Sequence, residues 1–277
     1  MNIWKNKCSH RHNNSQAKLS LFVFLSPIKK NMKKEEFLLK KRITQKVNKT
    51  IYTGNLLANG DKIMVGLSGG KDSYSLLEIL VDRRRNLPFK YELMACHIVA
   101  EDMGYEADMD FMTQFCQNLG VTLIVDKIEI GYTEASEKPA CFVCSYKRRS
   151  RLFTLAQEKE CNKLALGHHL DDAIETLLLN MVFHSTISSM PHTLSMCDGN
   201  ITTIRPLSMV MDKELNEYAI LREFPKEKKL CPYATDTHRT TMRNIIDEIE
   251  KVYKDARISL YRSMSNINSE YLPTMNP

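Results

Sequence analysis

The residues whose types and spacing are best suited to binding or catalysis form one short run, S-G-G-K-D-S, at positions 68–73. Glycines in such a run permit a tight turn and let backbone N–H groups approach an anion, and the helix that follows points its positive dipole end at the same place. The serines offer hydroxyl donors, the lysine a positive charge, and the aspartate a ligand for Mg²⁺. We therefore predict a binding site for the phosphates of a nucleotide, formed by Ser68, Gly69, Gly70, Lys71, Asp72 and Ser73.

This run differs from the two best-known phosphate-binding motifs. The Walker loop requires G-x-x-x-x-G-K-[ST], whereas here an aspartate follows the lysine, and no G-x-G-x-x-G of the dinucleotide type occurs. The alternative is a plain strand-to-helix turn rich in small residues. The complete hexapeptide directly after an apolar segment favours the phosphate site.

A second polar run, G-H-H-L-D-D-A-I-E-T at 167–176, also follows an apolar segment and begins a predicted helix. Asp171 and Glu175 are four residues apart and share a helix face, as do Asp172 and Thr176. These carboxylates can converge on the sheet edge where the phosphate loop ends, so Asp171 and Asp172 are candidate catalytic residues and Gly167 a candidate nucleotide-binding residue. The alternatives are an N-cap role for Asp171 and a transition-metal site.

Three cysteines stand apart from the other five. Cys141 and Cys144 have the C-x-x-C spacing, and Cys231 lies in a loop-like L-C-P-Y. Structural zinc requires four ligands, and the chain has no second C-x-x-C. Three thiolates suit an iron–sulfur cluster with one open iron, or a persulfide relay; a redox disulfide and coincidence are the alternatives. The other cysteines fit packing positions in a reducing, cytosolic setting.

A basic run follows Cys144 at once and consists of Lys147, Arg148, Arg149 and Arg151. Four cations at the start of a predicted helix oppose the helix dipole unless an anion lies there. A nucleotide phosphate, an RNA backbone or the charge of a cluster would supply that anion. The alternative is a solvated helix face.

The hexapeptide at 68–73 resembles the signature of the PP-loop ATP pyrophosphatases. The ordered set of S-G-G-K-D-S, P-x-C-x-x-C-S-x-x-R-R, G-H-H-x-D-D-x-x-E-T, I-R-P-L at 204–207 and a late cysteine is similar to the tRNA 2-thiocytidine biosynthesis protein (TtcA) family, from about 33 to 273. The lone Cys231 and the Ser-Tyr-Lys-Arg-Arg after Cys144 depart from the well-studied pattern and indicate a sister branch.

This resemblance implies a tRNA sulfurtransferase. ATP and Mg²⁺ would adenylate the C2 carbonyl oxygen of a tRNA cytidine, and sulfur carried by a [4Fe–4S] cluster would then displace AMP. The resemblance implies that Cys141, Cys144 and Cys231 hold the cluster. For this mechanism the residue types predict that Lys71, with a Mg²⁺ ion held by Asp72, stabilises the charge on the departing pyrophosphate, and that Asp171 or Asp172 holds the metal or orients the base. We also expect Arg148 or Arg149 to neutralise the α-phosphate.

The implied partners are tRNA and a sulfur donor, either a cysteine desulfurase or free sulfide, and a homodimer is compatible with the family. Two rival functions remain open. A PP-loop ligase or amidotransferase acting on a small molecule leaves the three cysteines without a role. A non-catalytic iron–sulfur or zinc RNA-binding module leaves the phosphate loop without one.

Short apolar segments alternate with amphipathic ones along most of the chain. Strands are predicted at 62–68, 91–100, 122–130, 163–169 and 201–207, and helices at 72–85, 106–119, 145–160 and 171–183. Residues 33–58, 212–223 and 239–258 have helical spacing. We expect an α/β fold with a doubly wound parallel sheet and flanking N- and C-terminal helices.

Composition and charge define the expected domains. The formal charge of +6 comes entirely from residues 1–31, which contain no acidic residue, so we expect a basic, disordered extension there. A helical segment at 32–60, an ATP-binding domain at 61–210 and a helical segment with the third cysteine at 211–277 would follow. Contact with tRNA is then expected at 33–49 and 147–151. No apolar run is long enough for a membrane helix, which predicts a cytoplasmic protein with no membrane partner.

Overall fold

The computed structural model describes residues 34–133, 135–196, 199–226, 233 and 238–272. Cys231 and the expected extension at 1–31 lie outside the described residues. Residues 1–38 and 39–277 form two compact units, and the second contains every element below apart from the first residues of α2 (Lys34–Thr53). The finer division at 60 and 210 stays a prediction.

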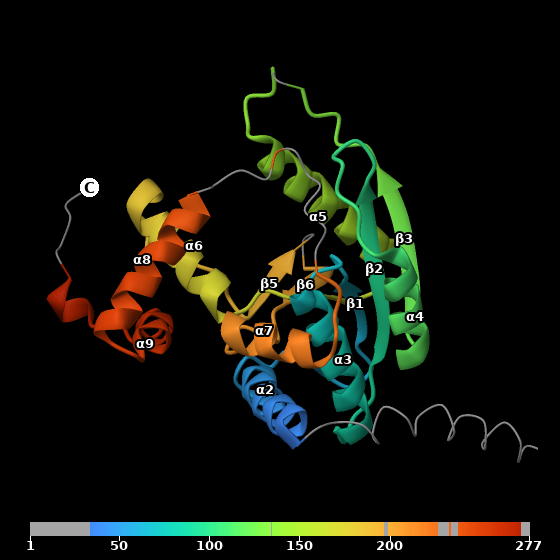
Figure 1. The fold of residues 1–277 in the computed structure, drawn as a ribbon, viewed down its shortest axis with the longest axis horizontal. Helices are drawn as coiled ribbons and strands as arrows, with labels where there is room; N and C mark the ends of the chain where they lie inside the picture. Colours follow the sequence, from blue (N-terminus) through green and yellow to red (C-terminus); the bar gives the residue numbers. More distant parts are fainter. Residues whose placement is uncertain (1–33, 134, 197–198, 227–232, 234–237, 273–277) are drawn as a thin grey trace, which may run out of the picture. The chain divides into compact units, whose positions relative to one another are not determined.

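The second unit is built on a six-stranded sheet (Figure 1). Its strand order is β3-β2-β1-β4-β6-β5, and all neighbouring pairs are parallel except β5 with β6. The sheet confirms the predicted doubly wound α/β fold. The strands are β1 (Lys62–Gly66), β2 (Glu92–Ala100), β3 (Thr122–Ile128), β4 (Lys163–Ala165), β5 (Thr193–Met196) and β6 (Ile201–Ile204).

Two predicted strand features differ from the structure. β4 ends at Ala165 because the residues from Gly167 onward leave the sheet to form a polar turn. The edge strand β5 is missing from the prediction because its residues are half-buried or exposed and lack an apolar alternation. An antiparallel edge strand on a parallel sheet is a common addition to this architecture.

Helices connect the strands and continue after them. They are α3 (Lys71–Asn86), α4 (Met109–Leu119), α5 (Ala140–Glu158), α6 (Leu170–His184), α7 (Asp212–Leu221), α8 (His238–Val252) and α9 (Ala256–Ser263), with a short 3₁₀ helix at Ser269–Tyr271. The predicted start of α5 at 145 is wrong. Pro139 caps that helix, so Cys141 and Cys144 lie in its first turns. The predicted helix 239–258 is two helices, α8 and α9.

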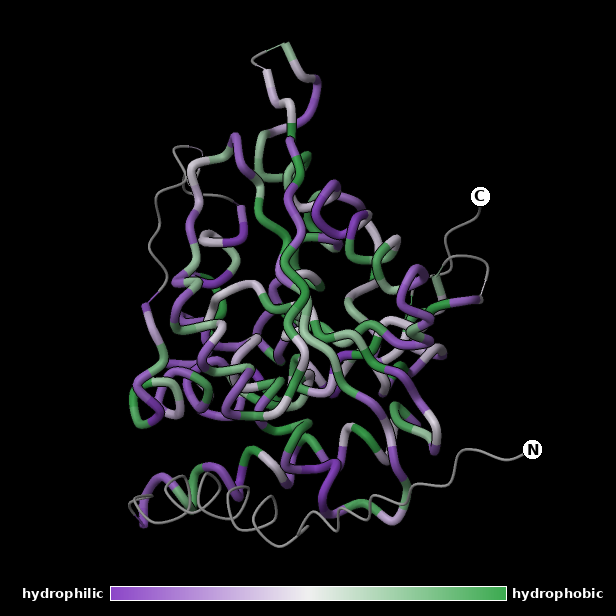
Figure 2. Tube along the Cα trace, turned by 90° about the vertical axis from the view of Figure 1, so that its right-hand side faces the viewer, coloured by the Kyte–Doolittle hydropathy of each residue, from purple (hydrophilic) through white to green (hydrophobic). Residues whose placement is uncertain are grey.

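Alternate side chains of the strands divide the core into two layers. Ile63 and Val65 of β1 pack with residues of α3, α4 and α7, whereas Met64 packs with Phe153 and Ala156 of α5. Figure 2 shows hydrophobic residues running through the middle of the trace. Because parallel strands all end at the same edge, the turns after β1, β2, β4 and β6 meet there. Among the described residues, no helix is long and apolar enough to cross a membrane.

Candidate active site

The predicted phosphate loop connects β1 to α3 and is held by its own serines. Ser73 Oγ accepts a hydrogen bond from Ser68 N (3.2 Å) and donates one to Gly70 O (2.8 Å). Gly69 has φ of +94°, and a Cβ there would lie 2.8 Å from Cβ of Ala107. The loop therefore requires glycine at 69, both for its left-handed backbone and for space.

Lys71 lies between two carboxylates at the mouth of this loop. Its Nζ is 2.9 Å from Asp72 Oδ1 and 2.8 Å from Asp212 Oδ1. Burial lowers the pKa of Lys71, but the two carboxylates together have a larger, opposite effect, so the pKa of Lys71 is above its ordinary value. Burial raises the pKa of Asp72, and Lys71 opposes that rise only in part. Burial also raises the pKa of Asp212, but its hydrogen bond with Lys71 outweighs this and leaves the pKa below its usual range.

Asp72 and Asp212 form a candidate cation site together with His169. One ligand atom of each lies within 4.8 Å of the other two. His169 Nδ1 accepts a hydrogen bond from Asp172 N (3.4 Å), so in the neutral ring the proton is on Nε2, which lies 3.5 Å from Asp212 Oδ1. Mg²⁺ prefers oxygen ligands and keeps several waters. The two carboxylates fit that ion, and His169 orients them.

The second predicted motif meets the phosphate loop through Gly167. A Cβ on Gly167 would lie 3.2 Å from the backbone atoms Asp72 C and Ser73 N. A side chain at this position would force the backbone of the phosphate loop to shift. The structure thus brings together two motifs that are about 100 residues apart in the chain.

The two candidate aspartates of this motif have different environments. Asp171 is buried, and its carboxylate accepts from Asp212 N (2.7 Å) and from Arg257 Nη1 (2.5 Å). Asp172 closes a capping box with His169, the N-cap of α6, and accepts from His169 N (3.0 Å). The alternative N-cap role for Asp171 is therefore wrong. Both aspartates hold neighbouring groups in place.

Arginines of α8 neutralise other polar residues of α6. Arg239 lies 3.3 Å from Asp172 Oδ1 and 3.4 Å from Thr176 Oγ1. Arg243 Nε donates to the fully buried Glu175 (2.8 Å). These arginines were not predicted from the sequence, although their spacing of four residues matches the spacing within the α6 motif. Asp212 and Arg257 were not predicted either, because no local pattern marks them.

Cys141 and Cys144 lie one turn apart on α5, and neither forms a disulfide. The Cys141 thiol is exposed, and its Sγ lies 3.3 Å from the carbonyl oxygen of Tyr233. The Tyr233 ring packs against Tyr132 at 5.1 Å between ring centroids. Cys144 packs against a small apolar cluster that includes Ile130. The Cys141 thiol thus lies beside Tyr233, which is two residues after the third predicted cysteine in the sequence.

The basic run on α5 divides into two groups. Lys147 Nζ donates to Ile130 O (2.5 Å), and Arg151 pairs with Asp126 (2.6 Å). The expectation that these two cations need an external anion at the helix start is wrong, because the protein already provides their partners. Arg148 lies 5.8 Å from the ring centroid of Tyr105, whose hydroxyl donates to Ser68 O (3.0 Å). Arg148 is therefore next to the phosphate loop.

Much of the predicted tRNA-binding charge of α2 is also paired within the protein. Lys40 lies 3.0 Å from Glu78, and Lys46 and Arg42 lie 2.6 Å and 3.1 Å from Glu214. These cations hold α2 against α3 and α7. They contribute less free positive charge than the sequence suggested.

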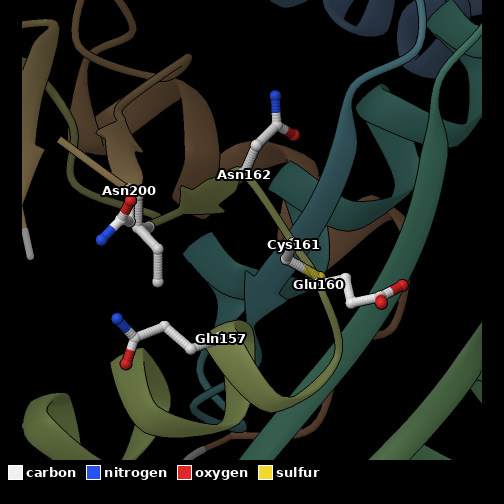
Figure 3. Close-up of a pocket in the computed structure, with 6 residues that line it drawn as sticks. Gln157, Glu160, Cys161, Asn162 and Asn200 are labelled. Atoms are coloured by element: carbon white, nitrogen blue, oxygen red, sulfur yellow. The ribbon is translucent and has the colours of Figure 1, made fainter.

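A separate pocket of about 280 Å³ lies at the opposite edge of the sheet (Figure 3). Asn162 and Asn200 in its lining directly precede β4 and β6, so the pocket opens at the amino ends of these strands. The phosphate loop follows the carboxyl end of β1. The pocket is therefore not part of the candidate active site. Its lining residues are Gln157, Glu160, Cys161, Asn162, Asn200 and Ile201.

Comparisons with known proteins agree with this arrangement. Residues 39–269 match the family model of the PP-loop domain. A protein of Geobacter sulfurreducens named tRNA-cytidine(32) 2-sulfurtransferase is 38% identical over 84% of this chain and 92% of its own length. One of the same name from Citrifermentans bemidjiense is 37% identical over 83% and 92%. The structure of the U34-tRNA thiolase NcsA from Methanococcus maripaludis with its [4Fe-4S] cluster is similar, with a TM-score of 0.71 and 25% identity over 86% of this chain and 81% of that chain.

Proposed function

The chain belongs to the PP-loop family and, within it, to the tRNA-cytidine(32) 2-sulfurtransferases, and we propose that it uses ATP to replace the C2 oxygen of a tRNA cytidine with sulfur. The observation that carries the proposal is the packing of Gly167 on the backbone of Asp72 and Ser73. It joins the phosphate loop and the second motif in one site at the carboxyl edge of the sheet. The names of the relatives support cytidine 32 as the target.

Adenylation solves the chemical problem that this reaction poses. A pyrimidine carbonyl oxygen is a poor leaving group, whereas AMP is a good one. In our proposal the carbonyl oxygen attacks the α-phosphate of ATP, and pyrophosphate leaves. The loop N–H groups and the protonated Lys71 stabilise the negative charge that develops on pyrophosphate. Arg148 packs on Tyr105, which donates a hydrogen bond to the phosphate loop, and in our proposal Arg148 neutralises the α-phosphate.

Asp72 and Asp212 are the ligands that we propose for Mg²⁺. When bound, the ion supplies positive charge to the phosphate oxygens. Asp171 accepts a hydrogen bond from the backbone N of Asp212, so we assign it a positioning role. Asp172 positions His169 in the same way.

Cys141, Cys144 and Cys231 are the ligands that we propose for a [4Fe–4S] cluster. The two described thiols fit this role because they share a helix face and form no disulfide. Tyr233, two residues after Cys231, lies beside Cys141, and two residues of chain span at most about 7 Å. When bound with three protein ligands, such a cluster supplies an iron that can carry sulfur. A cysteine desulfurase or free sulfide would provide that sulfur.

Mass spectrometry of tRNA nucleosides tests the proposed reaction. A strain lacking this protein should lack 2-thiocytidine, and a plasmid carrying the wild type should restore it. Lys71→Ala and Asp72→Ala should fail to restore it, because both change the phosphate site. Normal 2-thiocytidine with either variant would refute the ATP mechanism. Loss of 2-thiouridine instead would indicate a U34 thiolase, and unchanged tRNA would favour a small-molecule ligase.

Metal analysis of anaerobically purified protein tests the cluster. The wild type should contain about four irons per chain. Cys141→Ala, Cys144→Ala and Cys231→Ala should each lose most of this iron, whereas Ser145→Ala, a neighbouring change on α5, should keep it. Lys71→Ala should also retain iron while losing activity, which separates the two sites. Stoichiometric zinc, or no metal in the wild type, would rule out the proposed cluster.

A further inference from the structure

Arg205, in the I-R-P-L segment just after β6, is a buried cation that forms no ion pair with a described residue. The residue is only 8% exposed, and Nη1 donates to Pro191 O (2.7 Å). Its Nε is buried and has no hydrogen-bond partner among the described residues. No salt bridge within the described part of the chain includes it.

Arg257 shows how this protein otherwise buries an arginine. It is 9% exposed, nearly the same as Arg205, but it pairs with three carboxylates, those of Asp171, Asp247 and Glu250. A buried charge is costly unless it is paired. The contrast shows that the described residues leave the charge of Arg205 unmatched.

Two further groups lie with Arg205 at the carboxyl edge of the sheet. Leu166 N donates to Ile204 O (3.0 Å), so β4 and β6 end side by side; Arg205 directly follows β6, and His168 is three residues after the end of β4. His168 Nδ1 is also buried without a partner among the described residues. Burial, and then the nearby charge of Arg149 on α5, lower the pKa of Arg205. The pKa of His168 is lowered to about 4 by burial and by the charges of Arg205 and Arg149, although Asp172 opposes this shift.

The local charge is therefore positive. Asp172, the carboxylate that acts on His168, is already paired with Arg239. Arg149 is exposed and forms no ion pair with a described residue. The guanidinium groups of Arg205 and Arg149 and the orphaned Nδ1 of His168 thus share one locality, and β4 is the one strand between β6, which precedes Arg205, and β1, which precedes the phosphate loop.

We propose that Arg205, Arg149 and His168 form an anion subsite that binds a phosphate group. The proposal rests on the function proposed above, which brings two such groups to this edge: the α-phosphate of ATP and a backbone phosphate of tRNA. Guanidinium groups suit either one, because their N–H donors match phosphate oxygens in pairs. The chemistry is shared, so binding experiments must distinguish the two sources.

Two variants and one control test the subsite in the anaerobically purified full-length protein. Arg205→Lys keeps the charge but removes the planar fork, and Arg149→Gln changes an exposed side chain that the fold does not need. Arg85→Gln, an exposed arginine at the far end of α3, matches the second change in charge. Affinity is measured for an ATP analogue that is not cleaved between the α- and β-phosphates, and separately for a tRNA transcript over a salt series.

Both variants should lower the affinity for the same ligand about tenfold and leave the affinity for the other ligand unchanged. If that ligand is tRNA, Arg149→Gln should also reduce the salt slope by about one. Arg85→Gln should bind both ligands as the wild type does. Wild-type affinity for both ligands in both variants, or effects on different ligands, would overturn the subsite. If Arg205→Lys does not fold, Arg149→Gln decides. A wild type that binds no tRNA and converts no ATP to AMP would instead overturn the proposed function.

Discussion

Lys71 Nζ lies 2.8 Å from Asp212 Oδ1, although the two residues are 141 positions apart in the chain. Lys71 begins α3 and Asp212 begins α7, so two helix N-termini meet at the phosphate loop. The partial positive charges of both helix ends favour an anion there. The contact makes α7 a direct part of the proposed nucleotide site.

We expect Asp212→Asn to impair the site without unfolding the protein. The change removes one carboxylate from the proposed Mg²⁺ site and one partner from Lys71. A hydrogen bond between charged groups contributes about 1.5–3 kcal/mol, so conversion of ATP to AMP should fall roughly 10- to 100-fold. The concentration of Mg²⁺ needed for half-maximal rate should rise.

Glu217→Gln, an exposed change on the same helix, is the control and should leave the rate and the Mg²⁺ requirement unchanged. An Asp212→Asn enzyme with wild-type values for both would show that Asp212 has no part in the site.

Gly167→Ala should lower both activity and stability. The new Cβ would lie 3.2 Å from the backbone of Asp72 and Ser73, so the phosphate loop must move by a few tenths of an ångström. We expect at least about a tenfold loss of activity and a destabilisation of about 1–3 kcal/mol. Rates of ATP conversion and urea unfolding curves provide the two measurements.

Gly60→Ala gives a useful comparison, because Gly60 has φ of +83° and no atom near its Cβ position. It should lose about 1 kcal/mol of stability from backbone strain but no activity. Equal activity losses in the two variants would contradict the proposed close packing of the motifs.

Arg257→Met should destabilise the fold strongly. It leaves the buried Asp171 without its cation and removes a partner from Asp247 and Glu250. Loss of one partner of a buried ion pair costs about 3–5 kcal/mol. The double variant Asp171→Asn/Arg257→Met should recover part of that loss in urea unfolding experiments, and Arg262→Met, exposed on α9, should have little effect. No recovery in the double variant would mean that Arg257 acts mainly through packing.

Acid should destabilise the protein partly through buried histidines. His97 is buried, and its Nδ1 donates to Leu67 O (2.7 Å). Burial lowers the pKa of His97, and it lowers the pKa of His168 to about 4. Below about pH 6.5 the unfolded chain takes up protons that the folded chain does not, so stability is lost as the pH falls towards 4.

Each such histidine contributes up to about 1.4 kcal/mol per pH unit in this window. Free energies of unfolding at pH 7, 6 and 5 should therefore fall less steeply in His97→Asn than in the wild type. The exposed His184→Gln should have the wild-type slope. A wild-type slope in His97→Asn would show that His97 titrates normally in the fold.

The sequence alone identified the motifs whose chemistry depends on neighbouring residues. A phosphate loop needs its glycines, hydroxyls and lysine within one turn, and the two thiols need one helix face, so both patterns are visible in the chain. Strand and helix alternation likewise predicted the parallel sheet, because apolar periodicity is a local property. The start of α5 was the main local error, although Pro139 was available as a signal.

Only the tertiary structure decided which distant charges meet. Asp212 meets Lys71 across 141 positions of the chain, Arg257 meets Asp171 across 86, and Tyr233 meets Cys141 across 92. It also showed that Lys147 and Arg151 are paired within the protein, whereas Arg205 is not. The physical reason is that long-range pairing depends on how helices pack on the sheet, and single charged residues carry no local pattern that reveals their partners.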